Sequence, residues 1–459
     1  MKNNTDVNKL LAISILDGRN WDKVKAISDY FSEYALIRYR CRIEIAYLIF
    51  LSDKTKLLRK LNTQEKNKLN KIWHNFTFGD ALKIKEIEVE INHDVKAVEY
   101  FLKDKLAKTT VSDIIPFIHF GLTSYDINIP AYALMLSEFR SNILIPKIEE
   151  VTDRLKELIK KTKTMTMLGR THGQPALPTT MGKELAVFYQ RINKERNLLG
   201  RITPEAKLTG AVGNFNALVF AAPQVDWIKF SREFIGSLNL LPNLVTTQIL
   251  PYDSWIAFFD CVKRLNNIFL NLVVDLWWYI SFEYFLQKKK AQEVGSSTMS
   301  HKINPIQFEN AEGNLGLANS ILEFFGRKLS QTRLQRDLSD STVKRNFGLA
   351  FGFCLLAWDS ISSGLDRISP NPQKMKRDLD NHWEVFSEGI QTYLRIQGYK
   401  NAFELIKNKT RARTFTKEQI FRLIDSLPIK LEDKKFLKIK DLSEYRGLPE
   451  KLADLATQE

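Results

Sequence analysis

Residues 295–309 read GSSTMSHKINPIQFE, a short polar run that leads into more apolar sequence. Three small hydroxyl residues follow its glycine: Ser296, Ser297 and Thr298. Lys302 and Asn304 come next, and their side chains can hold a carboxylate or the negative charge that develops on one during a reaction. A plainer interpretation is a Ser-rich linker. In this plainer interpretation a helix begins near Pro305.

Long apolar tracts lie on both sides of this stretch, and each is long enough for a helix of several turns. The tracts are Leu134–Leu155, Met181–Leu199, Ser254–Leu286 and Leu317–Leu329. Only 14 prolines and 20 glycines interrupt the 459 residues. Long helices joined by short polar connections are typical of a helical bundle, so we expect an all-α fold. The connections are where we expect the chemistry to lie.

The most apolar tract, IFLNLVVDLWWYISFEYFL at residues 268–286, raises the question of a membrane. Asn271, Asp275 and Glu283 interrupt it, and on a helix they fall within an arc of about 120°. An aspartate at the centre of a membrane helix costs about 3 kcal/mol. We therefore expect a helix that is buried within a bundle, and no membrane span.

The net charge of +15 favours anionic partners, because it raises the rate at which anionic ligands are encountered. The lysines are spread along the chain, for example over residues 54–71, 147–163 and 430–440, and form no nucleic-acid recognition motif. We therefore expect a solvated basic surface and no nucleic-acid partner.

Cysteine usage and the N-terminus bear on the compartment. The chain has three widely separated cysteines, Cys41, Cys261 and Cys354. Such a sparse, odd set argues against a disulfide framework and favours a reducing compartment. The first residues, MKNNTDVNKLLAI, lack the pattern of a secretory signal. We expect a cytoplasmic protein.

The sequence predicts three regions. Residues 1–112 form a helical N-terminal region, and residues 113–369 form a long-helix bundle. The stretch SPNPQ at residues 369–373 is a Pro-punctuated break. Residues 370–459 then form a smaller helical region.

Three further segments carry candidate polar groups. LGRTHGQP at residues 168–175 presents His172 in a Gly- and Pro-containing loop, although a single loop histidine is more often structural. NHD at 92–94 and GLTSYDIN at 121–128 offer polar groups for a ligand, or ordinary helix caps. RDLSDSTVKR at 336–345 combines basic residues with a cap signal at Asp340–Thr342, a pattern that suits a phosphate or a plain capped helix.

Together these segments resemble the adenylosuccinate lyase family of the fumarase/aspartase superfamily, in its bacterial form. Residues 295–310 resemble the superfamily signature GSSxMPxKxNP, and residues 170–184 and 335–348 resemble blocks of this lyase. Further similar blocks run in the same order along nearly the whole chain: 14–24, 31–40, 91–105, 117–128, 210–217, 246–253, 312–322 and 381–385.

The resemblance implies an all-α, three-domain subunit. It also implies a homotetramer whose central helices form a shared bundle, with each active site built from three subunits. The implied activity is β-elimination of fumarate from two substrates of purine synthesis. Adenylosuccinate would give AMP, and the succinyl-carboxamide ribotide SAICAR would give AICAR. The resemblance implies no metal and no organic cofactor.

The resemblance also implies roles for individual residues. Ser296 is the base that removes the substrate proton, with Lys302 favouring its alkoxide, and His172 is the acid that protonates the departing nitrogen. Glu309 pairs with His172, because a neighbouring carboxylate raises the pKa of a histidine. The other implied positions bind the substrate: Arg19, Asn20, Asn92, His93, Asp94, Thr123, Ser124, Gln248, Ser297, Met299, Asn304, Arg336, Ser341, Thr342, Val343, Lys344 and Arg345.

Four positions depart from the family pattern. Asn20 stands in place of Tyr, Ser300 in place of the signature Pro, and Leu250 and Tyr252 in place of Glu and His. None of these changes removes an implied catalytic residue, so we expect an active enzyme. Two rivals stay open: a lyase of the same superfamily with another succinyl or amino-acid substrate, and a basic helical scaffold or nucleic-acid-binding protein. The basic block at residues 336–345 favours a nucleotide.

Overall fold

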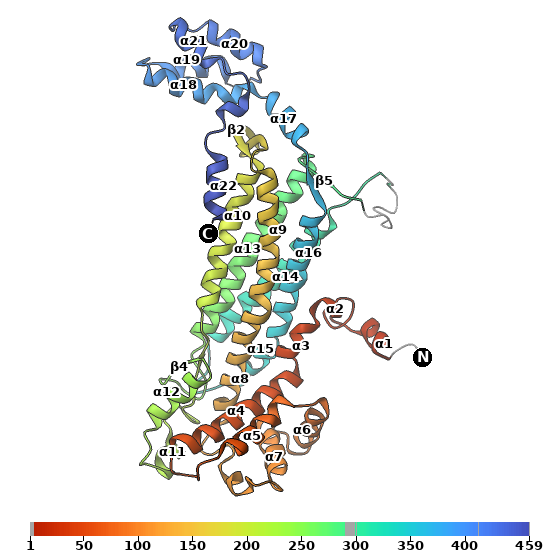
Figure 1. The fold of residues 1–459 in the computed structure, drawn as a ribbon, viewed down its shortest axis with the longest axis vertical. Helices are drawn as coiled ribbons and strands as arrows, with labels where there is room; N and C mark the ends of the chain where they lie inside the picture. Colours follow the sequence, from red (N-terminus) through yellow and green to blue (C-terminus); the bar gives the residue numbers. More distant parts are fainter. Residues whose placement is uncertain (1–3, 290–298, 300, 412, 459) are drawn as a thin grey trace. The chain divides into compact units, whose positions relative to one another are not determined.

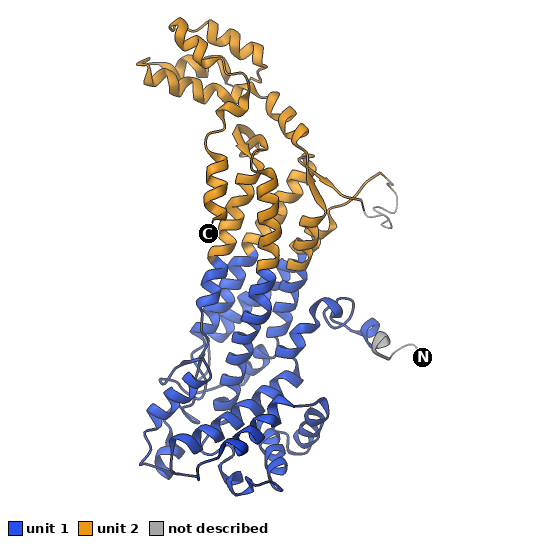
Figure 2. Ribbon diagram, in the orientation of Figure 1, with its two compact units in different colours: residues 1–148, 195–266, 313–357 blue, residues 149–194, 267–312, 358–459 orange. Residues whose placement is uncertain are grey.

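The computed structural model describes residues 4–289, 299, 301–411 and 413–458, and gives only the backbone of residues 4–7. Most of its regular structure is helical, as predicted (Figure 1). The chain forms two compact units, which Figure 2 colours separately. Unit 1 consists of residues 1–148, 195–266 and 313–357, and unit 2 of residues 149–194, 267–312 and 358–459. The three-region division by sequence order stays a prediction.

Side-chain caps fix the starts of several helices in unit 1. At α5 (Thr63–His74), the Asn62 side chain accepts from the Glu65 N–H, and Glu65 accepts from the Asn62 N–H. Such a capping box satisfies two helix N–H groups that lack partners in the helix itself. The other helices that lie wholly in unit 1 are α1 (Asn4–Leu11), α2 (Trp21–Val24), α3 (Ser28–Phe31), α4 (Glu33–Lys54), α6 (Phe78–Ile91), α7 (Asp94–Leu106), α8 (Ser124–Phe139), α11 (Asn216–Ala221), α12 (Trp227–Ser237) and α15 (Ser339–Lys344).

Aromatic side chains fill the core of unit 1. The rings of Phe259 and Phe347 lie 4.8 Å apart between centroids, and Phe31 packs edge-on against Phe139 at 5.1 Å. Gly348 lets the Phe31 segment approach, because a Cβ at this glycine would lie 2.8 Å from the Cβ of Phe31. Edge-on and tilted rings contribute stability beyond the apolar area that they bury.

Among the described residues, five long helices contribute to both units: α9 (Ile145–Thr162), α10 (Met181–Arg201), α13 (Asp253–Ser281), α14 (Ile306–Leu329) and α16 (Phe347–Asp366). Two predictions are confirmed here, since α10 begins at Met181 and α14 begins directly after Pro305. The predicted tract Leu134–Leu155 runs from α8 through a single π-helical turn, Arg140–Leu144, into α9.

The prediction of one buried helix over residues 268–286 is partly wrong. Helix α13 ends at Ser281, because Glu283 adopts a left-handed conformation with φ of 60°. The next residues form strand β5 (Phe285–Gln287), which pairs antiparallel with β6 (Ile368–Pro370). Burial is also incomplete, since Trp277 and Trp278 are 38% and 50% exposed in the single chain.

A different segment of the described chain passes the length and composition test for a membrane span. Residues 339–366 include α16, and 67% of their most apolar part is buried inside the protein. Trp358 and Phe351 of α16 are completely buried. Burial against protein side chains accounts for this apolar composition in the same way as for a core helix.

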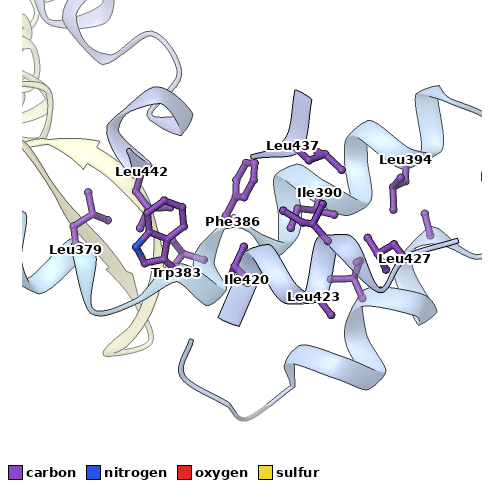
Figure 3. Close-up of a cluster of buried hydrophobic side chains, with 14 of the residues drawn as sticks. Leu379, Trp383, Phe386, Ile390, Leu394, Ile420, Leu423, Leu427, Leu437 and Leu442 are labelled. Carbon is purple, nitrogen blue, oxygen red and sulfur yellow. The ribbon is translucent and has the colours of Figure 1, made fainter. Parts of the chain in front are cut away.

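Unit 2 also contains a β-hairpin and a group of short C-terminal helices. The hairpin consists of β1 (Thr166–Thr171) and β2 (Gln174–Thr180), whereas the sequence predicted only a loop at residues 168–175. The helices pack around a buried hydrophobic cluster (Figure 3) that includes Trp383, Phe386 and Ile390. They are α17 (Pro372–Asp380), α18 (Ser387–Ile396), α19 (Ala402–Thr410), α20 (Lys417–Asp425) and α21 (Leu431–Leu437). Helix α22 (Pro449–Thr457) follows them in the sequence.

Candidate active site

His172 lies at the tip of the β1–β2 hairpin in unit 2. Thr171 pairs with Gln174, so the connection is the two-residue turn His172–Gly173. Their φ angles are 53° and 73°, and two successive positive values are the pattern of a tight type I′ hairpin turn. Glycine adopts this conformation readily, whereas histidine does so at a cost in free energy. The turn leaves the His172 side chain exposed.

Two sets of contacts hold strand β1 of this hairpin. Leu168 of β1 is 2% exposed and belongs to the hydrophobic cluster of the C-terminal helices. Arg170 donates from Nη2 to Oδ2 of Asp378 at 2.7 Å, and the Tyr284 hydroxyl donates to the same oxygen at 2.5 Å. Burial alone would raise the pKa of Asp378, but the Tyr284 and Arg170 hydrogen bonds lower it. The hairpin that carries His172 is therefore anchored at both an apolar and a charged contact.

A cavity of about 940 Å³ lies beside the hairpin within unit 2. Thr171 and Gly173 line it on either side of His172, and Trp278 and Asp275 line it from α13. Burial, together with the charge of Glu184, raises the pKa of Asp275. His172 itself is not among the lining residues. The imidazole is thus presented on the surface of the chain rather than in this cavity.

Glu309 lies in the first turn of α14, also in unit 2, and is exposed. Its Oε1 accepts a hydrogen bond from Nε1 of Trp277 at 3.2 Å. Within the single chain no ion pair or hydrogen bond joins Glu309 to His172, and both residues are described. Met299 is 45% exposed and accepts from the backbone N–H of the exposed Lys302 at 3.2 Å. Asn304 is partly buried, whereas Ser296, Ser297 and the substituted Ser300 lie outside the described residues.

Two predicted segments meet at Asp94 in unit 1. Arg345 donates from Nη2 to Oδ2 of Asp94 at 2.9 Å and from Nη1 to the Ser341 hydroxyl at 2.7 Å. Arg40, whose side chain is 2% exposed, donates to the same Asp94 oxygen at 2.6 Å. Burial would raise the pKa of Asp94, but the charges of Arg40 and Arg345 outweigh it and lower the pKa to about 2. The carboxylate is therefore ionised and holds Arg345 in place.

A second meeting of predicted residues joins Gln248 to Arg336. Arg336 donates from Nη1 to Oε1 of Gln248 at 2.8 Å, and Gln248 in turn donates to the carbonyl of Ala211 at 2.9 Å. The Arg336 guanidinium lies over the Tyr125 ring, 4.1 Å from its centroid. Stacking on an aromatic face and a hydrogen bond from one edge leave the other guanidinium N–H groups for a ligand.

The cap predicted at Asp340–Thr342 is wrong. Helix α15 begins earlier, at Ser339, whose N–H donates to the Asp337 carboxylate at 2.8 Å. Asp340 is inside the helix and buried, and its carboxylate accepts from Lys344 at 2.5 Å. Asp340 and Lys344 stand four residues apart, so they lie on the same face of the helix, and both are buried there. Thr342 and Val343 lie between them on α15.

The remaining predicted positions are helix boundaries. Asn92 ends α6 in a left-handed conformation, and Nδ1 of His93 accepts from the Lys96 N–H at 3.1 Å, which caps α7. The Thr123 N–H donates to Asp126 at 3.0 Å at the start of α8, directly before Ser124. Arg19 is exposed and Asn20 directly precedes α2. The capping interpretation of residues 92–94 and 121–128 is thus confirmed. The contact of all these positions with a substrate stays a prediction.

Several residues of this arrangement were missed by the sequence reasoning. Arg40 and Asn128, which share a hydrogen bond of 2.8 Å, support Asp94 from within unit 1. Trp277 contacts Glu309, and Tyr125 lies beneath Arg336. Only the Asp340–Lys344 pair carried a local signal, because opposite charges four residues apart are expected to meet on a helix. The other contacts join segments that are distant in the sequence.

Two family models match the chain, a lyase family over residues 18–318 and the adenylosuccinate lyase C-terminal region over residues 332–445. The adenylosuccinate lyase of Legionella pneumophila strain Corby is 45% identical over 446 residues, which cover 96% of this chain and 98% of that protein. The chain belongs to the adenylosuccinate lyase family. The member of this family from Dictyostelium discoideum is also 45% identical, over 97% of this chain and 98% of its own.

Solved structures support the fold of this adenylosuccinate lyase family member. A fumarate lyase from Mesorhizobium sp. BNC1 superposes with a TM-score of 0.72 over 94% of this chain and 97% of that chain. The sequence identity is 16%, so the likeness concerns the fold alone. It confirms the predicted all-α fold.

Proposed function

We propose that the chain eliminates fumarate from adenylosuccinate, giving AMP, and from SAICAR, giving AICAR. The observation that carries this proposal is the 45% identity, over nearly the full length, to proteins named adenylosuccinate lyase. The contacts in unit 1 support it, because Arg336 and Arg345 are held by Gln248 and Asp94 with their guanidinium groups partly exposed. Two fixed guanidinium groups suit a phosphate ester.

The elimination needs a base and an acid. The base removes a proton from the carbon next to a carboxylate, the C–N bond breaks, and the acid protonates the departing nitrogen. We assign the base to Ser296 and the acid to His172. The exposed position of His172 at the tip of an anchored hairpin supports this assignment, because the imidazole is accessible while its backbone is held.

Negative charge develops on the carboxylate of the succinyl group as the proton leaves. We assign its stabilisation to Lys302 and Asn304, which follow Ser296 in the sequence and precede α14. Ser297 and Met299 complete the contacts to the succinyl end, and no metal or organic cofactor takes part. We assign the nucleotide end to Gln248, Arg336, Ser341, Thr342, Val343, Arg345 and the polar residues Arg19, Asn20, Asn92, His93, Asp94, Thr123 and Ser124.

The assembled site is proposed to be shared between subunits of a homotetramer. Within one chain the Glu309 carboxylate accepts from Trp277 and not from His172. A Glu309 of one subunit that faces His172 of another would raise the pKa of the imidazole and keep it protonated, as an acid requires. The exposed Trp277 and Trp278 support an association of subunits along α13, because large apolar side chains favour burial. The three free, buried cysteines agree with a cytoplasmic protein.

Fumarate release, followed by its ultraviolet absorbance, tests the proposal. The purified full-length protein is assayed with adenylosuccinate, with SAICAR, and with argininosuccinate, aspartate and malate as substrates of other lyases. We expect release from the first two substrates only. Release from one of the others alone would assign the chain to a different reaction of the superfamily. No release, combined with nucleic-acid binding that falls steeply with salt, would favour a basic scaffold.

A further inference from the structure

A buried ion pair, Lys344–Asp340, lies in the same segment of unit 1 as Arg336 and Arg345. Nζ of Lys344 donates to Oδ2 of Asp340 at 2.5 Å, and their side chains are only 1% and 7% exposed. Burying a charged pair requires that hydrogen bonds satisfy the remaining donors and acceptors. Lys344, which the sequence suggested as a direct substrate contact, therefore has its ammonium group turned into the protein.

Two tyrosines supply those hydrogen bonds. The Tyr252 hydroxyl donates to Oδ2 of Asp340 at 2.6 Å and accepts from Lys344 at 2.7 Å, which closes a ring of three groups. The Tyr125 hydroxyl donates to the other carboxylate oxygen, Oδ1, at 2.5 Å. Tyr252 and Tyr125 are 2% and 1% exposed. The hydroxyl of Tyr252 is therefore the bridge between the lysine and the carboxylate.

The same network reaches the surface through Tyr125. Its ring supports the Arg336 guanidinium at 4.1 Å from the centroid, while Gln248 holds one edge of that guanidinium at 2.8 Å. The position of the ring is set by the bond from its hydroxyl to Asp340. A change at Asp340 is thus transmitted to Arg336 through a single aromatic side chain.

We propose that Tyr252 is a positioning residue, which holds the Lys344–Asp340 pair and, through Tyr125, orients Arg336 toward the substrate phosphate. This inference rests on the proposed function, in which Arg336 binds that phosphate. Tyr252 is one of the positions where the sequence departs from the family pattern.

Loss of the Tyr252 hydroxyl has a specific structural consequence. The Lys344 ammonium group would lose an acceptor in a buried place, where an unsatisfied donor is costly. The Tyr125 oxygen, to which Nζ already donates a long hydrogen bond of 3.4 Å, is an acceptor that Lys344 keeps. If Lys344 draws that oxygen closer, the bond from Tyr125 to Asp340 weakens and the ring beneath Arg336 shifts.

Binding of AMP and of adenosine, which differ by the phosphate alone, tests the inference by calorimetry on the full chain. Tyr252→Phe is expected to weaken AMP binding by a factor of about ten and to leave adenosine binding unchanged. Tyr39→Phe is a matched control. Tyr39 is also buried, and its hydroxyl donates to the carboxylate of Glu138, which in turn pairs with Arg42. The control is expected to bind both ligands as the wild type does.

A double-mutant cycle shows whether the effect passes through Arg336. In an Arg336→Gln background, Tyr252→Phe is expected to have little further effect on AMP binding, since coupled residues are not additive. The inference is overturned if Tyr252→Phe weakens AMP and adenosine equally, if it weakens neither, or if its full effect persists without Arg336. It is also overturned if the wild type binds AMP no better than adenosine. Fumarate release by the wild type, measured in parallel, decides the proposed function separately.

Discussion

Arg345 donates a hydrogen bond from Nη2 to Oδ2 of Asp94 at 2.9 Å, and so joins two segments that are 251 residues apart in the sequence. Asp94 also accepts a hydrogen bond from the buried Arg40. One carboxylate therefore neutralises a core arginine and holds a second arginine near the surface. The stability of unit 1 and the position of a proposed phosphate ligand thus depend on the same side chain.

Asp94→Asn keeps the size of this side chain and removes its charge. We expect the free energy of unfolding to fall by about 2–3 kcal/mol, because Arg40 stays buried without a counter-charge. We also expect the KM for adenylosuccinate to rise, since Arg345 loses a fixed partner. Urea unfolding and steady-state kinetics measure the two effects.

Asp104→Asn provides the control, because Asp104 lies on the same helix, α7, and is exposed. A surface change of this kind is expected to alter stability by less than about 0.5 kcal/mol. If the Asp94 and Asp104 variants had equal free energies of unfolding, the ion pairs of Asp94 would contribute nothing to stability.

The turn that presents His172 can be tested with a pair of glycines. Gly173 and Gly398 have φ of 73° and 86°, and a Cβ at either one meets no atom within 4 Å. Alanine at each position is therefore expected to cost about 1 kcal/mol of backbone strain and to cause no clash. Only Gly173→Ala is expected to lower kcat, because only this turn carries His172. Equal kcat values for the two variants would argue against a catalytic role of the hairpin tip.

The Lys344 side chain predicts an unusual dependence of stability on pH. Burial lowers its pKa to about 8, despite the opposing charge of Asp340, from an ordinary value of 10.5. Between these two values the unfolded chain binds more protons than the folded chain, so this group makes the free energy of unfolding rise with pH. The contribution is absent in Lys344→Met. From pH 7 to pH 9, we expect the wild type to gain about 1 kcal/mol relative to this variant in urea unfolding. A parallel pH dependence of the two proteins would contradict the burial of a charged Lys344.

The sequence predicted the fold better than it predicted the surroundings of the site. Apolar periodicity placed the start of α10 correctly, because a helix with a buried face repeats its apolar residues along the chain. The start of α14 was predicted from the polar run that ends at Pro305. The same periodicity did not show the end of α13, which depends on the left-handed Glu283 and on the pairing of β5 with β6. Strand pairing between distant segments has no local signal.

In the candidate site too, local motifs were predicted from the sequence, whereas contacts between distant segments were not. Arg345 and Arg336 were identified from a basic motif, and Asp94 lay in the polar segment 92–94 that the sequence also singled out. Gln248 came from the family resemblance alone, and neither contact could be predicted from spacing. Tyr252 was noted only as a departure, and its role became visible when its hydroxyl was found between Lys344 and Asp340. The capping signal at Asp340 was misleading, since aspartate suits both a helix cap and a buried ion pair.

The central claim is that this chain releases fumarate with His172 as the acid. The most direct measurement is the initial rate of fumarate release from adenylosuccinate by the wild type and by His172→Ala, at equal concentrations of folded protein. We expect the wild type to be active and the variant to lose at least a factor of about 100, the contribution of a positioned acid. An inactive wild type, or a variant as fast as the wild type, would contradict this account.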